Sequence, residues 1–318
     1  TQISYENGSN VNKAETFAKA ADAVILVVGL TSEGGGNESG DEAEGHDRTT
    51  LILPRNQNAY ISGVAQSVKE DNVNTPVVLV LMNGGPVDVS QFRDSNNIDA
   101  IVWCGYPGQA GGTSIADMLF GKTNPSGRLT QTWYPEAFVQ QVSLTDMGMR
   151  PNATSGSPGR TYRFYEGTPV FKFGQGMSYS TFQHAALHLK HIQNLSQHQH
   201  QHQHLRRKLQ IAPYQHQQKQ QMVQAALTVT NLSPVDGTEV VLLFASAPNA
   251  GKHGVPRKQL VGFQRVFIRA GATVTVQLEV DRRRFEHSDN SGAMHSASGI
   301  WTLWTGVEAE GRQVSLKF

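Results

Sequence analysis

The sequence predicts a mostly parallel α/β sandwich domain followed by an all-β sandwich domain. In the first half of the chain, continuous apolar runs alternate with segments of helical periodicity, which is typical of a parallel sheet covered on both faces. In the second half, short apolar strands are separated by turn sequences such as SPVDG and RAGA, which is typical of an antiparallel sandwich. We therefore expect one domain at residues 1–182 and a second at residues 183–318.

The first domain is expected to contain three buried strands separated by helices. A short amphipathic helix at residues 14–22 leads into the apolar run DAVILVVGL at residues 22–30, which we interpret as a fully buried strand. A helix at residues 55–70 follows, because its apolar residues recur near helical spacing. The remaining elements are a buried strand at 75–85, a third strand at 98–103, and a glycine-rich turn with a helix that stops at Gly121.

The second domain shows short strands in the runs LTVTNL, TEVVLLFA, QLVGFQRVFI, TVTVQLEV and IWTLWTG. A Gln/His-rich tract at about residues 193–221 has too little apolar content to order itself, so we expect a disordered insertion within the sandwich. Alternating histidines in an extended strand would share one face and could bind a transition metal weakly. They are His198, His200, His202 and His204, and no acid or cysteine joins them, so we expect no structured metal site.

The overall composition argues against several classes of function. The 318 residues carry a formal net charge of +1, which gives no electrostatic basis for a nucleic-acid partner. The longest apolar runs are far too short to span a bilayer, so we expect no membrane insertion. Cys104, the one cysteine, lies in an apolar strand and is expected to be a core thiol. Asn-X-Ser/Thr sequons favour a secreted, extracellular glycoprotein, and they begin at Asn7, Asn37, Asn152, Asn194 and Asn231.

A cluster of acidic residues follows the first strand. The segment ESGDEAEGHDR at residues 38–48 lies beyond the carboxyl end of that strand, and polar loops at 83–85 and 105–109 follow the next two strands. Ligands of open α/β sheets bind outside the carboxyl ends of the strands. Carboxylates, amides, a tyrosine and glycine-exposed backbone at this edge can hydrogen-bond a polyhydroxylated ligand. The glycines match neither a P-loop nor the dinucleotide fingerprint, so no cofactor is indicated.

The acids of this loop, and two aromatic residues near it, each admit two interpretations. An acidic loop is often no more than solvated charge. Glu42 and Glu44, however, would share one face of an extended segment, and a neighbouring negative charge raises the pKa of a carboxyl group that must donate a proton. Trp103 and Tyr106 lie at and just beyond the end of the third strand, where an aromatic face can stack on a sugar ring. A core position is the alternative for each aromatic residue.

Long motifs follow one another along nearly the whole chain outside the Gln/His-rich tract. They are VVGL, EAEGHDRTTLILP, VVLVLMNGGPVDVS, IVWCGYPGQAGGTSIADMLFGKTNPSGRLTQTWYPE, TDMGMR, PGRTYRFY, FKFGQGMSYSTF, VTNLSPVDGTEVVLLFA, VPRKQLVGFQRV and WTLWTG. In identity and order these runs resemble the β-xylosidase-like branch of glycoside hydrolase family 3. The resemblance implies an α/β sandwich and a fibronectin type III-like domain. In the family, an N-terminal (β/α)8 barrel that carries an Asp nucleophile precedes them.

The resemblance places the general acid/base on the EAEGHDR run. It implies Glu42 as the first choice, Glu44 as the second and Glu38 as the third. No run resembles the barrel or its nucleophile motif, and the opening strands of the α/β domain would precede Thr1, so we interpret the chain as the C-terminal part of an enzyme. Retaining hydrolysis needs two carboxyl groups about 5–5.5 Å apart. The chain alone is therefore expected to be inactive.

The implied activity is that of a retaining, exo-acting β-D-xylosidase on xylan-derived oligosaccharides, without a cofactor or metal. α-L-Arabinofuranosidase and β-glucosidase are alternatives within the family. A non-catalytic extracellular module from a truncated gene, binding cell-wall polysaccharide or a partner protein, is the alternative from another class. The expected partners are a xylo-oligosaccharide or related glycan and the missing barrel, and neither nucleic acid nor a membrane.

Overall fold

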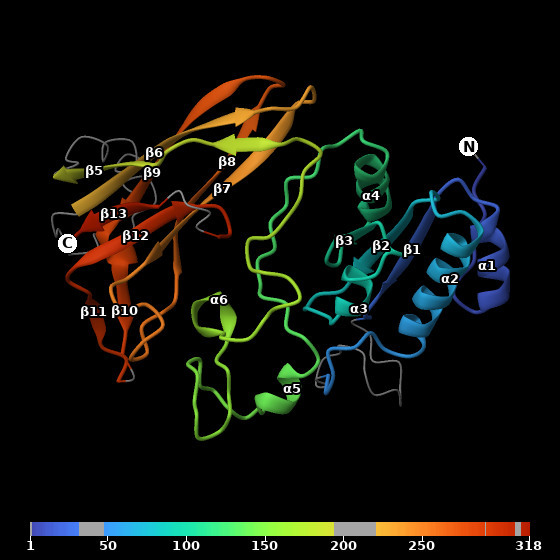
Figure 1. Cartoon of the computed structure of the whole chain (residues 1–318), viewed down its shortest axis with the longest axis horizontal. Coiled ribbons are helices and arrows are strands. Elements are labelled where there is room, and N and C mark those ends of the chain that lie inside the picture. The colour runs from blue at the N-terminus through green and yellow to red at the C-terminus, as the bar shows by residue number, and fades with distance from the viewer. Residues whose placement is uncertain (1, 32–47, 194–220, 290, 309–312) are drawn as a thin grey trace, which may run out of the picture. The chain divides into compact units, whose positions relative to one another are not determined.

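The computed structural model describes residues 2–31, 48–193, 221–289, 291–308 and 313–318 (Figure 1). These residues form two compact units. The first, which we call the α/β unit, comprises Thr1–Thr123, Gln131–Thr161 and Tyr165–Phe173. The second, which we call the sandwich unit, comprises Asn124–Thr130, Tyr162–Phe164 and Gly174–Phe318. Two short segments that lie before residue 174 therefore belong to the sandwich unit.

The α/β unit contains a three-stranded parallel sheet with the order β1-β2-β3. Its strands are β1 (Val24–Gly29), β2 (Val77–Met82) and β3 (Ala100–Trp103). β1 pairs with β2 over its whole length, and β3 pairs with β2 from Ala100 onward. The structure thus confirms the parallel sheet that the apolar runs predict.

Two helices connect the strands of this sheet: α2 (Gln57–Asp71), which the sequence predicts at residues 55–70, and the short α3 (Ser90–Arg93). α1 (Val11–Lys19) precedes β1, and α4 (Gly111–Leu119) and α5 (Phe138–Gln141) follow β3. Most of α6 (Thr161–Phe164) belongs to the sandwich unit. α1 begins earlier than its apolar residues indicate, because the Asn10 side chain accepts a hydrogen bond from the backbone N–H of Lys13 and caps the helix. Figure 1 shows α1 and α2 lying together beside β1, with α4 near β3.

The central strand and the edge strand β1 of this sheet are not buried equally. The central strand β2 is buried on both faces, and its Leu79 and Val80 have no exposed surface. On β1, Leu26 is buried, whereas Ile25 and Val27 are 44% and 56% exposed. The prediction of a fully buried first strand is therefore wrong. The reason is topological, because β1 is an edge strand and successive side chains of a strand point to opposite faces.

The sandwich unit contains two antiparallel sheets, which confirms the predicted all-β fold. One sheet has the order β13-β12-β7-β8, and in the other β6 pairs with β4, β5 and β9. The strands are β4 (Phe182–His184), β5 (His188–Gln193), β6 (Gln221–Asn231), β7 (Gly237–Ser246), β8 (Gln259–Ile268), β9 (Thr273–Asp281), β12 (Ile300–Thr305) and β13 (Val314–Lys317). A 3-10 helix, η1 (Arg282–Phe285), and a hairpin of β10 (Glu286–Ser288) and β11 (Met294–Ser296) complete the unit.

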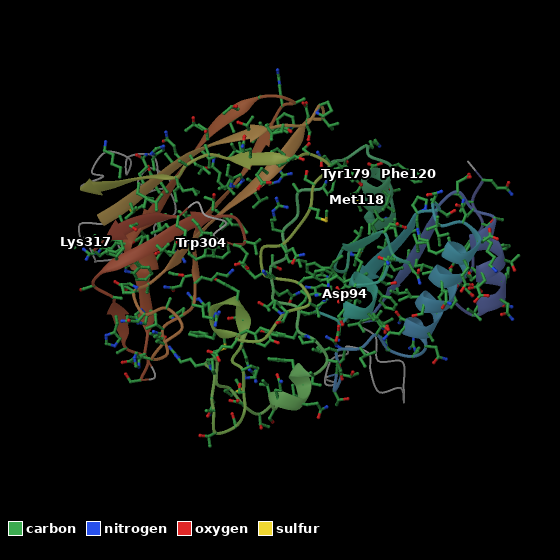
Figure 2. All side chains as sticks on the ribbon, in the orientation of Figure 1. Asp94, Met118, Phe120, Tyr179, Trp304 and Lys317 are labelled. Carbon is green, nitrogen blue, oxygen red and sulfur yellow. The ribbon has the colours of Figure 1, made fainter. Side chains whose placement is uncertain are left out.

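Alternating side chains of these sheets build the sandwich core. Leu227 of β6 and Trp301 of β12 are buried there, and the ring of Trp301 lies edge-on to Phe285 with centroids 5.3 Å apart. Trp304, labelled in Figure 2, lies on the other face of β12 and stacks on Phe244 with centroids 6.0 Å apart. Both tryptophans are buried, as expected for core residues.

The Gln/His-rich tract joins two neighbouring strands of one sheet. β5 and β6 pair as a hairpin, and the pair nearest the tract is Gln193 with Gln221. The intervening residues 194–220 lie outside the described residues, so the disorder expected for them stays a prediction. The described strands place the insertion between paired strands of the sandwich unit.

Candidate functional site

The carboxyl ends of three parallel strands lie at one edge of the α/β unit. β1 leads to the acidic loop, β2 leads to Asn83 and its glycines, and β3 leads to Tyr106. This is the convergence that the sequence predicts for a ligand site. Glu38, Glu42 and Glu44 lie outside the described residues, so the choice among them stays a prediction. The structure does describe how both ends of the acidic loop are held.

Gln57 holds the point where the acidic loop leaves the sheet. Its carboxamide oxygen accepts a hydrogen bond from the backbone N–H of Gly29 at 2.9 Å, and its amide donates to the carbonyl of Gly29 at 2.9 Å. A side chain at Gly29 would not fit, because a Cβ atom there would lie 1.9 Å from the carbonyl oxygen of Met82. The end of β1 is therefore fixed both by close backbone approach and by a two-point side-chain contact.

A closed ring of three hydrogen bonds holds the point where the acidic loop returns. The N–H of Leu51 donates to Oε2 of Glu136 at 2.6 Å, and the N–H of Glu136 donates to Oδ2 of Asp88 at 2.7 Å. The N–H of Asp88 closes the ring by donating to the carbonyl of Leu51 at 2.7 Å. The second oxygen of Glu136 accepts from the Thr50 hydroxyl at 2.8 Å. We call this arrangement the carboxylate ring.

The two aromatic candidates have different surroundings. The indole N–H of Trp103 donates to the carbonyl of Asn83 at 2.8 Å, and its ring lies edge-on to Trp133 with centroids 5.7 Å apart. Trp133 is fully buried and also packs edge-on against Phe171. Tyr106, in contrast, is 49% exposed. Of the two rings, that of Tyr106 is the more accessible to a sugar.

Two further polar groups support the strand ends from within. The side chain of Asn83 is buried, and its amide donates to the carbonyl of Gly85 at 2.5 Å, which folds the turn after β2. The thiol of Cys104 donates to the carbonyl of Leu81 at 3.3 Å. Burial raises the pKa of this thiol, so the reactive thiolate is disfavoured at neutral pH. Cys104 is only half-buried, so the expectation of a core thiol is wrong, because the residue lies where β3 ends.

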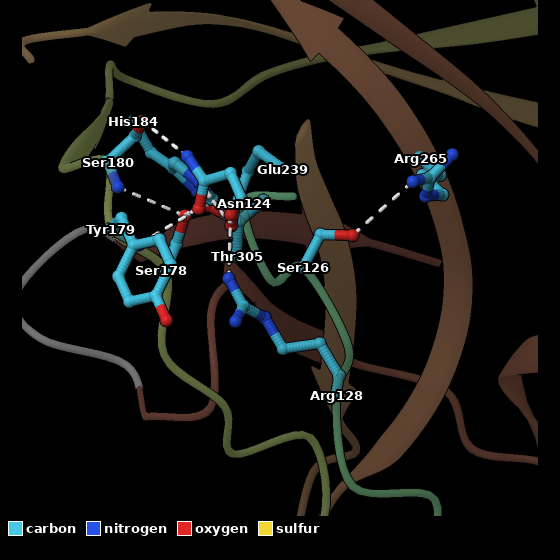
Figure 3. A network of polar contacts seen from close by, with 10 residues as sticks. All are labelled: Asn124, Ser126, Arg128, Ser178, Tyr179, Ser180, His184, Glu239, Arg265 and Thr305. Carbon is cyan, nitrogen blue, oxygen red and sulfur yellow. Dashed lines mark hydrogen bonds and ion pairs between the residues drawn. The ribbon is translucent and has the colours of Figure 1, made fainter. Parts of the chain in front are cut away.

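The sandwich unit holds a separate polar cluster, drawn in Figure 3. Nη2 of Arg128 lies 2.6 Å from Oε2 of Glu239, and the ring nitrogens of His184 lie 3.3 Å from Oε1 of Glu239 and 3.0 Å from the hydroxyl of Thr305. The side chain of Glu239 is only 7% exposed, and a cavity of about 200 Å³ adjoins the cluster. Because both oxygens of Glu239 are already engaged, we assign the cluster a structural role.

Asn124 holds the segment Asn124–Thr130, which carries Arg128, in place within the sandwich unit (Figure 3). Its amide donates to the hydroxyl of Ser180 at 2.8 Å and to the carbonyl of Asp236 at 3.0 Å. Its carbonyl oxygen accepts from the hydroxyl of Ser178 at 2.8 Å and from the backbone N–H of Tyr179 at 2.9 Å. The nitrogen and the oxygen of this carboxamide thus each make two hydrogen bonds, which fixes the start of the segment within the unit.

Within the described ranges, no three His, Cys, Asp or Glu side chains are grouped so that they could hold a metal ion. Among the same residues, no helix combines the length and the hydrophobicity that crossing a membrane requires. The histidines of the Gln/His-rich tract are outside these ranges.

A family model described as "Glycosyl hydrolase family 3 C-terminal domain" matches residues 3–179, which is more than half of the chain. The chain belongs to glycoside hydrolase family 3. A second model, described as "Fibronectin type III-like domain", matches residues 239–309. The first match confirms the resemblance to family 3 that the sequence motifs carry, and the two matches together agree with the α/β and sandwich folds observed.

Named relatives in family 3 are similar over most of this chain. Beta-D-xylosidase 1 of Arabidopsis thaliana is 40% identical over 88% of the chain, and Beta-xylosidase/alpha-L-arabinofuranosidase 2 of Medicago sativa subsp. varia is 37% identical over 85%. The chain spans 35% and 33% of their lengths, about a third. A solved exo-beta-xylosidase of the family, in complex with a xylobiose aziridine probe, superposes with a TM-score of 0.78 at 30% identity, covering 100% of this chain and 38% of that one.

Sequence reasoning missed the residues that hold the acidic loop. Gln57, Asp88 and Glu136 act on backbone groups of residues far away in the sequence, and every residue carries such groups. One signal was available for Asp88, because it stands between Val87 and Val89, which are both fully buried. A carboxylate inside a buried run needs hydrogen-bond donors, and their identity becomes visible only in the folded chain.

Proposed function

We propose that this chain supplies the general acid/base of a retaining, exo-acting β-D-xylosidase that acts on xylan-derived oligosaccharides. The observation that carries the proposal is the position of the described residues on either side of the acidic loop. Its two described ends are held at Gly29 and Leu51, at the edge where the carboxyl ends of the parallel strands lie. The names of the similar xylosidases support the same substrate class.

In this proposal one carboxyl group of the loop acts twice. It first donates its proton to the departing glycosidic oxygen, and the resulting carboxylate then removes a proton from the attacking water. Glu42 is the first choice for this group, and Glu44 is the second. The nucleophile would be an Asp of the barrel that precedes the α/β domain in longer family members. Tyr106 is the better placed of the two aromatic residues to contact the sugar.

The test compares the chain alone with a fusion to the preceding N-terminal part of the Arabidopsis thaliana relative, which we call the fusion enzyme. We expect the fusion enzyme, but not the chain alone, to release nitrophenol from nitrophenyl β-xyloside. In the fusion enzyme, Glu42→Ala should lower kcat/KM for xylobiose by about 10²–10⁴-fold. Glu44→Ala distinguishes the second choice, and Glu166→Ala, an exposed glutamate of the same unit, is the control.

Two results would contradict the proposal. Robust turnover by the chain alone that disappears in Glu42→Ala would show that the barrel is not needed. Full activity of the fusion enzyme in both Glu42→Ala and Glu44→Ala would remove the acid/base role from both of these glutamates. Because one relative is named as both a xylosidase and an α-L-arabinofuranosidase, nitrophenyl α-L-arabinofuranoside belongs in the same assay.

An extracellular location is part of the same proposal. It is supported by sequons such as those at Asn7 and Asn152, which lie on residues the structure describes as exposed or half-buried. Secretion from a eukaryotic host, followed by enzymatic removal of N-linked glycans, should lower the mass of the product. A product with the unmodified mass would argue against glycosylation at these sites.

A further inference from the structure

The carboxylate ring joins three segments that are distant in the sequence. Leu51 belongs to the segment that follows the acidic loop, Asp88 follows β2, and Glu136 precedes α5. Each residue of the ring donates its backbone N–H to the next, and the acceptors are two carboxylates and one carbonyl. Hydrogen bonds to a charged acceptor are stronger than those between neutral groups. The return point of the loop is therefore held strongly.

Neighbouring bonds limit the freedom of the ring. Oδ1 of Asp88 accepts from the N–H of Ser90 at 2.9 Å, which fixes the carboxylate at the start of α3. The Thr50 hydroxyl donates to Glu136, and its oxygen accepts from the N–H of Ile52 at 3.1 Å. The side chain of Glu136 thus contacts two consecutive residues of the return segment. A rotation of that segment would break both contacts at once.

The opposite end of the acidic loop is held as firmly. There the carboxamide of Gln57 engages both backbone groups of Gly29, and β1 approaches the carbonyl of Met82 too closely for any side chain. The loop that carries Glu42 and Glu44 therefore spans two fixed points. Of the two, the return point is the nearer in sequence to both glutamates, and Glu136 is the side chain that bonds directly to both Thr50 and Leu51 there.

We propose that Glu136 is a positioning residue for the acid/base of the acidic loop, acting through the backbone of Thr50 and Leu51. This positioning role rests on the proposed function, because the group that Glu136 positions is the one that transfers the proton, Glu42 or Glu44. The physical reason is geometric. A misplacement of about 1 Å in a catalytic group can cost on the order of 10²-fold in rate. Glu136 itself does not touch the substrate in this proposal.

The test uses the fusion enzyme and two substrates that differ in their need for acid assistance. The leaving group of xylobiose must be protonated, whereas dinitrophenolate leaves without a proton. In Glu136→Gln, we expect kcat/KM for xylobiose to fall about 30–100-fold and kcat/KM for dinitrophenyl β-xyloside to change less than about threefold. A merely structural role would lower both values together, because it would reduce the amount of active enzyme.

Two further variants make the result decisive. Thr50→Val removes one donor to Glu136 and should shift the ratio of the two kcat/KM values in the same direction by a smaller factor. Glu166→Gln makes the same chemical change at an exposed position of the α/β unit and should leave the ratio unchanged. Thermal unfolding of each variant of the 318-residue chain checks that the fold is retained. Equal losses on both substrates, or equal ratios in Glu136→Gln and Glu166→Gln, would overturn the proposal.

The two proposals fail in different ways. If Glu42→Ala and Glu44→Ala leave xylobiose hydrolysis unchanged, the acid/base assignment fails, and the positioning role fails with it. If one of those variants loses activity while Glu136→Gln keeps the normal ratio, the acid/base assignment stands and only the positioning role fails. A selective loss on xylobiose in Glu136→Gln, together with the loss in Glu42→Ala or Glu44→Ala, supports both.

Discussion

Arg128 and Glu239 form a hydrogen-bonded ion pair inside the sandwich unit, with 2.6 Å between Nη2 and Oε2. Their side chains are only 16% and 7% exposed. Arg128 comes from the segment Asn124–Thr130, whereas Glu239 lies on β7. Removing one partner of such a pair leaves a buried charge without compensation, and this usually costs more than the pair itself contributes. The pair therefore links Asn124–Thr130, a segment from the first half of the chain, to a strand of the sandwich unit.

The first prediction concerns this ion pair. Arg128→Met should lower the free energy of unfolding of the sandwich unit by about 3–5 kcal/mol, because Glu239 would be left buried and partly unpaired. Scanning calorimetry of the whole chain measures the change. Arg265→Met is the matched control, since Arg265 is exposed on β8 and contacts Ser126 only at 3.4 Å. Equal unfolding profiles for Arg128→Met and Arg265→Met would contradict the prediction.

Elements with a strong local pattern were predictable from the sequence. The run QLVGFQRVFI coincides with β8, Gln259–Ile268, and the apolar spacing of 55–70 gives α2 to within two residues at its start. The exposed face of β1 was not predictable, because an edge position depends on the pairing of whole strands. The assignment of Asn124–Thr130 to the sandwich unit has the same cause, since it depends on partners such as Glu239 more than a hundred residues later.

The convergence of the strand ends was predictable from the sequence, whereas the contacts that hold the residues beside the acidic loop were not. Parallel strands bring their carboxyl ends to one edge, so the order of apolar runs and polar loops was sufficient to predict this convergence. The carboxylate ring has no such pattern, because Glu136 and Asp88 bind backbone N–H groups, which are the same in every residue. Periodicity reports which face of an element is buried and carries no information about which distant amide a carboxylate meets.

The second prediction separates two adjacent glycines of α4. A Cβ atom at Gly111 would lie 2.6 Å from the ring of Pro107, whereas a Cβ atom at Gly112 would meet nothing within 4 Å. Gly111→Ala should therefore destabilise the α/β unit, by an amount on the order of 1–3 kcal/mol for an overpacked site. Gly112→Ala should be neutral or stabilising by up to about 1 kcal/mol, because alanine favours a helix. Urea unfolding of the two variants tests this, and the opposite order would contradict it.

The third prediction concerns pH. Nζ of Lys69 and the backbone N–H of Val77 donate to Oδ2 of Asp99 at 2.8 and 2.7 Å. Burial acts to raise the pKa of Asp99, but these hydrogen bonds outweigh it, so the pKa is lowered on folding. A lowered carboxyl pKa contributes stability that is present above the ordinary value of about 3.9 and is lost as the pH falls through the folded-state value.

Asp99→Asn should therefore reduce the free energy of unfolding at pH 7 by about 1 kcal/mol, a modest amount because the Asp99 side chain is 45% exposed and screened by solvent. The difference from the unmodified chain should shrink as the pH falls below about 3.9. Urea unfolding at several pH values measures it. Asp22→Asn, the same substitution at an exposed position before β1, is the control. A difference that stays constant with pH would rule out the lowered pKa as its cause.

The last prediction separates the two aromatic residues at the end of β3. Trp103 donates a hydrogen bond to Asn83 and packs on buried Trp133, so Trp103→Ala should lower the free energy of unfolding of the chain by about 3 kcal/mol. The ring of Tyr106 is half exposed, so Tyr106→Ala should be closer to neutral for stability. In the fusion enzyme, loss of a stacked aromatic face, worth about 0.5–1.5 kcal/mol, should instead raise KM for xylobiose about two- to tenfold with kcat unchanged.

Tyr5→Ala is the matched control for Tyr106→Ala, because Tyr5 is a 77% exposed tyrosine of the same unit and lies outside the strand ends. It should leave KM and kcat unchanged. If Tyr106→Ala also leaves KM unchanged, Tyr106 does not contact the sugar. If it lowers kcat and kcat/KM equally, the ring contributes only in the transition state, and a simple stacking platform is the wrong description. A raised KM alone would identify Tyr106 as a residue that contacts the sugar.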